Sequence, residues 1–229
     1  MQDEQLAAIR QKIDQIDTEL LALIKNRMAL SAEVSQTKGP DDAIFRPGRE
    51  AEMFARLAER KGSLPFEFVG GLWRVIISAS IGLQKPDFSI ASTQSCFADA
   101  LGLAAGQLIV LPPQQHPDAL LASLLAGESD IALVDLDELQ QIAPQIMADE
   151  RAKIIAGISS DSEDLTAISS YVIANSPTDD TDYDMVVVLD SCADKIISVP
   201  AEAYQKYLSE QGEGWQYLGR YAHLSKPVG

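Results

Sequence analysis

Residues 5–37 read QLAAIRQKIDQIDTELLALIKNRMALSAEVSQT, and this stretch decides the fold. Its apolar residues recur in alternating steps of three and four, the spacing of one helix face and nearly that of a heptad repeat. Gly39 and Pro40 end the pattern, so the sequence predicts one long helix over 5–37. The residues of this face, called the seam below, are Leu6, Ile9, Ile13, Ile16, Leu20, Leu23, Leu30 and Val34.

Two shorter helices are predicted next. One spans 48–61 with Met53, Phe54 and Leu57 inward, and the other runs from about Pro65 to Pro86. The apolar residues of the last helix are Phe66, Val69, Leu72, Trp73, Ile76, Ile77 and Leu83. Three helices in under ninety residues make a thin core, so we expect an intertwined homodimer to complete it.

Beyond residue 87 the pattern changes to short apolar runs that alternate with helical stretches, which is typical of an α/β fold with parallel βαβ units. The prediction is therefore a two-domain protein, with an all-α three-helix domain over 1–87 and an acidic α/β domain over 88–229. Strands are expected at 88–91, 108–111, 131–134, 154–158, 168–174, 185–189 and 196–199, and helices at 96–105, 118–126, 136–147 and 201–210.

Composition narrows the functional classes. Residues 1–87 carry 12 Lys and Arg against 13 Asp and Glu, whereas 88–229 carry 6 against 21, so nucleic acid and anionic membranes are poor partners for the second part. Cys96 and Cys192 cannot form a disulfide framework or a zinc cluster. The acidic stretch 179–184 is interpreted as a solvated loop, not a calcium site. An acidic start and no apolar run near ~18 residues predict a cytoplasmic protein.

A cation interrupts the seam. Arg27 continues the heptad series of Leu6, Ile13 and Leu20, so its guanidinium faces the predicted helix partner. Burying an unpaired charge costs several kcal/mol, so a carboxylate from protein or ligand should meet it. Arg10 flanks the same seam, and an antiparallel second chain would bring its Arg10 to this Arg27.

The predicted helices carry further polar residues at their ends and, on the third helix, on the presumed inner face. Lys38 stands at the far end of the first helix, and Arg49 and Glu50 stand in the first turn of the second. Ser80 and Gln84 are four residues apart, so they point to the same side of the third helix.

Together, Arg10, Arg27, Lys38, Arg49, Glu50, Ser80 and Gln84 resemble, in order and spacing, the active-site pattern of the all-helical chorismate mutases over residues about 5–85. The resemblance implies that Arg10 of the partner and Arg27 bind one substrate carboxylate, with Arg49 near the charged side chain of chorismate. It further implies that Lys38 and Gln84 donate to the ether oxygen, Glu50 accepts from the ring hydroxyl and Ser80 contacts the ring carboxylate. Neither cofactor nor metal is implied.

These roles fit a pericyclic rearrangement of chorismate to prephenate, because that reaction needs only a compact conformer and donors at the developing charge. The amide of Gln84 does not titrate, so activity should persist through mildly alkaline pH. The chain departs from the family at Arg46, where many members carry an acidic residue, and this puts substrate affinity in doubt.

Three functions stay open from the sequence: a chorismate mutase, an isochorismate pyruvate lyase with the same fold, and a non-catalytic protein that binds an aromatic-pathway metabolite. The part after residue 87 faintly resembles a prephenate dehydratase, but the dehydratase Thr-Arg-Phe signature is absent, Thr166-Ala167-Ile168 being nearest. We therefore expect a degenerate, non-dehydratase domain with a regulatory, ligand-binding or structural role. The hydroxyl-rich segment 92–96 is interpreted as either a helix N-cap or a carboxylate site.

Overall fold

A computed structural model of the chain describes residues 2–37, 39, 42–149, 151–159, 168–175, 185–190, 195–201, 204 and 215–225. The chain divides into two compact units, Met1–Pro40 and Asp41–Gly229. An N-terminal helical region is followed by an α/β region, so the predicted fold class is confirmed. The acidic stretch 179–184, Cys192 and most of the predicted helix at 201–210 lie outside the described residues.

The first unit is one continuous helix, α1 (Gln2–Thr37), as the seam predicts. Every seam residue is between 42% and 64% exposed in the single chain. A helix with an apolar stripe exposed along its whole length is not stabilised by its own unit, because tertiary packing of that stripe supplies most of a helix's stability in proteins.

The second unit begins with α2 (Pro47–Arg60) and α3 (Phe66–Gln84), close to the predicted bounds. Pro47 stands at the start of α2, where its fixed φ favours a helix and its missing N–H costs nothing. The predicted inward face of α2 is confirmed: Phe54 is buried, and Met53 and Leu57 pack against the same core.

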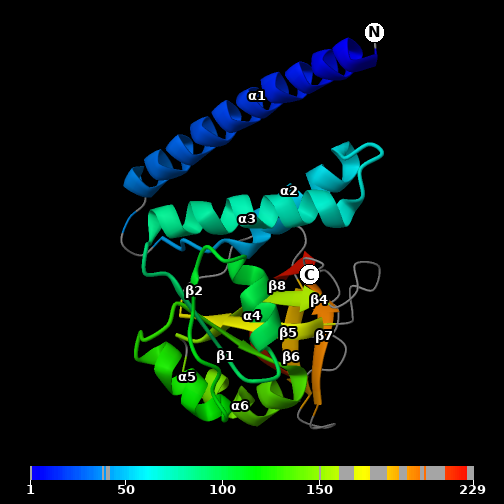
Figure 1. The fold of residues 1–229 in the computed structure, drawn as a ribbon. Helices are drawn as coiled ribbons and strands as arrows, with labels where there is room; N and C mark the ends of the chain where they lie inside the picture. The colour runs from blue at the N-terminus through cyan, green and yellow to red at the C-terminus, as the bar shows by residue number, and fades with distance from the viewer. Residues whose placement is uncertain are drawn as a thin grey trace. The chain divides into compact units, whose positions relative to one another are not determined.

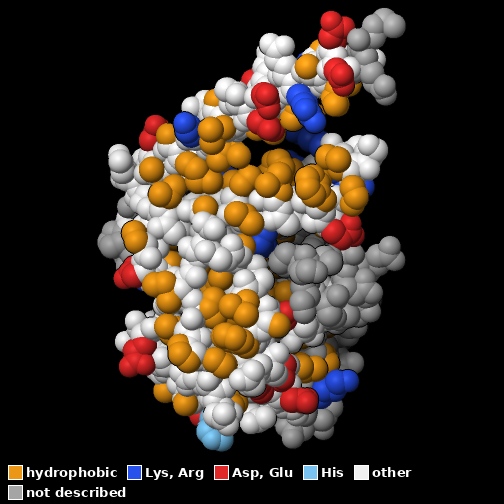
Figure 2. Space-filling model, in the orientation of Figure 1, with side chains coloured by type: hydrophobic (Ala, Val, Ile, Leu, Met, Phe, Trp, Pro, Cys, Tyr) orange, Lys and Arg blue, Asp and Glu red, His pale blue; other side chains and the backbone are white. Residues whose placement is uncertain are grey.

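On α3 the apolar residues Leu72 and Leu83 are both about half exposed. They lie on an outward stripe with Phe68 and Val75, and Figure 2 shows hydrophobic side chains gathered along this helix. α3 is apolar on more than one face, so periodicity alone could not select the buried one. α3 is also long and apolar enough to cross a membrane, although the sequence analysis finds no apolar run of that length. In the structure, 44% of this apolar window is buried inside the protein.

Among the elements whose bounds the described residues give, the α/β region contains helices α4, α5 and α6 and one eight-stranded sheet (Figure 1). The helices are α4 (Phe97–Ala104), α5 (Pro117–Leu125) and α6 (Leu136–Ala148). The strands are β1 (Ser89–Ser92), β2 (Ile109–Val110), β3 (Ile131–Val134), β4 (Lys153–Ser159), β5 (Ile168–Ala174), β6 (Met185–Asp190), β7 (Lys195–Pro200) and β8 (Trp215–Ser225).

The strand order is β2-β1-β3-β5-β4-β8-β6-β7. The predicted parallel units are confirmed at one end, where β1 pairs in parallel with both β2 and β3. β5 then enters antiparallel between β3 and β4, which makes the sheet mixed. The sequence analysis missed β8, which pairs in parallel with β4 and antiparallel with β6.

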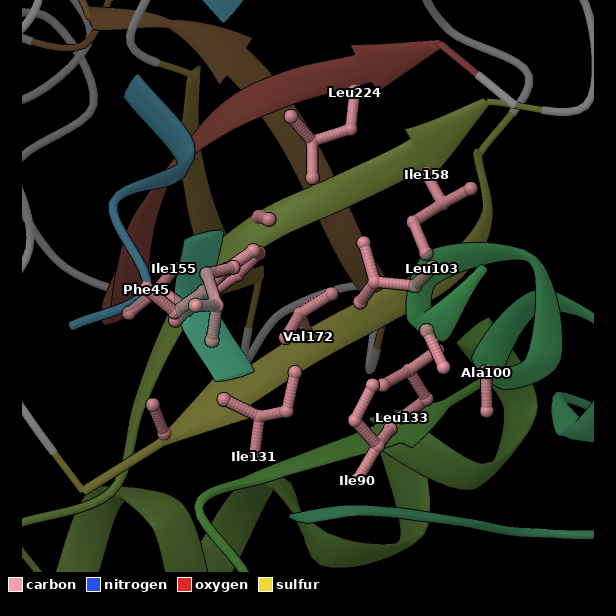
Figure 3. Packing of buried hydrophobic residues seen from close by; sticks show 14 of the residues in the cluster. Phe45, Ile90, Ala100, Leu103, Ile131, Leu133, Ile155, Ile158, Val172 and Leu224 are labelled. Carbon is pink, nitrogen blue, oxygen red and sulfur yellow. The ribbon is translucent and has the colours of Figure 1, made fainter. Parts of the chain in front are cut away.

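Side chains of the sheet alternate between two cores, as the period of a strand requires. Ile131 and Leu133 face the core covered by α2, α3 and α4 (Figure 3), whereas Ala132 and Val134 face the core covered by α5 and α6. The first core continues across the predicted boundary at residue 87, because Ile77 and Ile81 of α3 pack in it with residues of the sheet.

Polar contacts also link α3 to the α/β region. The Ser78 hydroxyl donates to the Leu103 carbonyl at 2.8 Å. Lys85, at the end of α3, forms an ion pair with Asp130, whose other oxygen accepts from the Ser89 backbone N–H at 2.8 Å. The end of α3 is therefore fixed to the start of β1.

Candidate functional site

The cations of the first unit lie along α1. Arg10 is exposed and Arg27 is partly buried, and a helical rise of ~1.5 Å per residue separates them by roughly 25 Å. One pocket of molecular size cannot contain both residues of the same helix. Lys38 lies outside the described residues.

In the second unit, Arg49 and Glu50 point in different directions from the first turn of α2. Arg49 is exposed, whereas Glu50 is 6% exposed. The Glu50 carboxylate accepts from the guanidinium of Arg74 on α3, with 2.6 Å between Nη1 and Oε2. Arg74 is 2% exposed, and its guanidinium carbon lies 5.0 Å from the centre of the Phe54 ring.

Sequence reasoning missed Arg74. A usable signal was present, since Arg74 is the one charged residue between Glu67 and Lys85 in an otherwise apolar helix. A buried guanidinium requires a compensating charge, but its partner is 24 residues away on another helix. Periodicity within one helix therefore could not identify it.

Ser80 and Gln84 lie on one side of α3, as their spacing predicts. Ser80 is buried and its hydroxyl donates to the Ile76 carbonyl at 2.8 Å, while Nε2 of Gln84 donates to the Ser80 carbonyl at 3.2 Å.

A second polar cluster joins the ends of β1 and β3. The hydroxyls of Thr93 and Ser95 both donate to one oxygen of Glu138, at 2.6 and 3.1 Å. The same oxygen accepts from the Asp135 N–H in the capping box of α6. The N-cap residue of α4 is Cys96, without a side-chain cap. The two hydroxyls therefore bind a carboxylate of their own chain, and neither caps α4.

Beside this cluster, Asp99 of α4 accepts from the hydroxyls of Ser169 and Ser170 on β5, each at 2.7 Å. Burial raises the pKa of the Cys96 thiol, so the neutral form predominates near neutral pH. Among the described residues no group of His, Cys, Asp and Glu could hold a metal ion.

Helices α1, α2 and α3 thus carry cations, a buried carboxylate and amide and hydroxyl donors at family-like spacing. Residues 9–85 match the model of the family chorismate mutase type II. This mutase-like segment contains every residue of the predicted site, from Arg10 to Gln84.

Two curated proteins are also similar to this chain in sequence. The chain is 28% identical over 143 residues to a bifunctional chorismate mutase/prephenate dehydratase of Pseudomonas aeruginosa, covering 58% of this chain and 39% of that protein. It is 35% identical over 85 residues to the bifunctional enzyme of Neisseria gonorrhoeae, covering 37% and 23%. The chain therefore spans less than half the length of these relatives. The Pseudomonas match is longer than the mutase-like segment, so the likeness continues beyond it.

A solved structure is also similar. The X-ray structure of prephenate dehydratase from Streptococcus mutans aligns with a TM-score of 0.40 at 11% identity, over 60% of this chain and 99% of that one.

Proposed function

We propose that this protein is a chorismate mutase that converts chorismate to prephenate as a cytoplasmic homodimer. The observation that carries the proposal is the family match over 9–85, which includes all seven residues of the predicted pattern. Residues 1–87 would supply the chemistry. Residues 88–229 would act as a structural or regulatory part without dehydratase activity.

The exposed seam of α1 supports the dimer. A long apolar stripe on a soluble helix is typical of a protein interface, and near-heptad spacing suits pairing with another helix. An antiparallel second copy would place its Arg10 beside this chain's Arg27. The two cations could then share one pocket, although Arg10 and Arg27 of the same helix are separated by roughly 25 Å. Each site would then contain residues of both chains.

The residues would act by positioning and charge stabilisation. Arg10 of the partner, Arg27 and Arg49 would hold the dianion in its compact conformer, and Ser80 would contact the ring carboxylate. Lys38 and Gln84 would donate to the ether oxygen, where negative charge develops as its bond to carbon breaks. Glu50 would accept from the ring hydroxyl. No nucleophile, cofactor or proton transfer is required.

The decisive assay follows chorismate loss and prephenate formation by the full-length protein, with and without aromatic amino acids. Arg27→Ala should abolish turnover and leave the dimer folded, whereas Lys25→Ala, on the opposite side of α1, should retain it. Unimpaired turnover by Arg27→Ala would refute the assignment. Release of pyruvate from isochorismate would instead identify a lyase, and binding without turnover a sensor.

A further inference from the structure

The buried Arg74–Glu50 pair joins the two helices that carry the second half of the site. Glu50 lies in the first turn of α2 and Arg74 in the middle of α3, with Nη1 and Oε2 2.6 Å apart. Both side chains are at least nine-tenths buried. The contact therefore constrains the Glu50 carboxylate and the separation of the two helices at once.

Stability does not explain this pair well. Removing two charges from water costs several kcal/mol per ion, and apolar replacements of buried pairs are often neutral or stabilising. The pair also leaves Nε of Arg74 buried without a hydrogen-bond partner in the structure as described, which adds a desolvation cost. A functional role of the Glu50 carboxylate would explain why the protein contains this buried pair.

The surroundings of Arg74 fix its orientation. Its guanidinium lies over the Phe54 ring, 5.0 Å from the centre, and Phe66 packs edge-on against the same ring with 6.5 Å between centroids. A planar guanidinium held over an aromatic face has few rotamers available. Arg74 uses one N–H on Oε2, and the second oxygen, Oε1, retains lone pairs for a substrate hydroxyl.

We propose that Arg74 is the positioning residue of the mutase site, which holds the Glu50 carboxylate in the orientation that accepts from the substrate's ring hydroxyl. This inference rests on the proposed function. Arg74 does not touch substrate; it acts through Glu50. Lysine would keep the charge but not the planar fork, so it would replace Arg74 only in part.

The test is a double-mutant cycle in the full-length protein, with chorismate as substrate and circular dichroism to quantify folded enzyme. Arg74→Gln and Glu50→Gln should each lower kcat of the folded enzyme about 10- to 100-fold, since a misplaced group costs that much, while KM changes less than about three-fold. The double variant E50Q/R74Q should match Glu50→Gln within about three-fold, and Arg74→Lys should be intermediate.

Arg56→Gln is the matched control, because it breaks an exposed Arg56–Glu52 pair on the same helix. It should keep the wild-type kcat. If Arg74→Gln does not fold, the inference is tested by comparing kcat of E50Q/R74Q with kcat of Glu50→Gln. The double variant can be used because it contains no uncompensated buried charge.

Wild-type kcat in folded Arg74→Gln would overturn the inference, because a purely structural residue changes only the folded fraction. A further ten-fold loss in the double variant beyond Glu50→Gln, or an equal loss in Arg56→Gln, would overturn it as well. A wild-type protein without turnover would overturn the proposed function and this inference with it.

Discussion

Helices α1 and α3 are both rich in apolar residues, but they differ in what covers them. All eight seam residues of α1 are more than two-fifths exposed in the single chain, whereas α3 buries eight residues, Arg74 and Ser80 among them. The sheet of the same chain covers α3 through a shared core. The difference indicates that the α/β region stabilises the α2–α3 part of the mutase-like segment, whereas the exposed seam of α1 is the surface that the proposed second copy would cover.

Removing the sheet is expected to have the largest effect. A fragment of residues 1–87 loses the partners of Phe54, Ile77 and Ile81, which all pack in the core built on the sheet. We expect it to show no cooperative thermal unfolding by circular dichroism and to aggregate on size-exclusion chromatography. A fragment of residues 41–229, which keeps one compact unit, should unfold cooperatively. A well-folded, active 1–87 fragment would show that α2 and α3 do not need the sheet.

Breaking the seam should come next. Leu20→Glu places a charge in the middle of the stripe, where pairing with a second helix would bury it at a cost of several kcal/mol. Light scattering should show a monomer, and turnover should fall at least about 100-fold, because each site of the proposed dimer contains residues of both chains. Gln11→Glu, an exposed change off the seam, should stay dimeric and active. A dimeric Leu20→Glu protein would exclude the seam as the interface.

A cavity in the shared core should have a smaller effect. Ile81 is 4% exposed, so Ile81→Ala should lower the free energy of unfolding by about 2–4 kcal/mol. Leu101 on α4 is 51% exposed, and Leu101→Ala should cost less than about 1 kcal/mol. Urea titrations measure both. Equal costs would mean that Ile81 contributes nothing through the core.

The sequence alone located most helices and strands, because the spacing of apolar residues and the Gly and Pro residues at element ends can be recognised within a short segment. It could not give strand direction, so the antiparallel entry of β5 was not anticipated. β8 was missed where glycine interrupts its pattern, yet the structure requires Gly219: a Cβ there would lie 2.7 Å from the Ile154 nitrogen. The sequence contains Gly219, but it does not reveal the neighbouring strand β4, which lies too close to leave room for a side chain.

The candidate site divides in the same way. Arg27 could be singled out because it breaks the pattern of its own helix. Arg74 could not, because its significance depends on Glu50 across the α2–α3 contact. The Thr93, Ser95 and Glu138 cluster likewise forms only when β1 and β3 pair. Tertiary partners far apart in the chain leave no periodic signal.

Cys96 gives the smallest effect, and it reports on the shared core. The thiol is 1% exposed, and burial raises its pKa from the usual 9.0. Because the thiol has a higher pKa in the folded chain than in the unfolded chain, its protonated form contributes to the free energy of unfolding. This contribution is complete below pH ~9 and is lost as the pH rises further. Above that pH, unfolding free energy should fall less steeply in Cys96→Ala than in the parent, by at most about 1.4 kcal/mol per pH unit.

The measurement uses a Cys192→Ser background, so that one thiol is followed. Ellman's reagent at pH 8 should label Cys96 far more slowly in the native protein than in the urea-unfolded chain. Burial excludes the thiol from solvent, and its raised pKa lowers the fraction of reactive thiolate. In Leu20→Glu the labelling rate should be unchanged, since that variant disturbs the seam and not the core. In Ile81→Ala it should rise, because a cavity in the same core eases opening. Fast labelling in Leu20→Glu would mean that pairing along α1 stabilises the core after all, and the contrast between the two helices would fail.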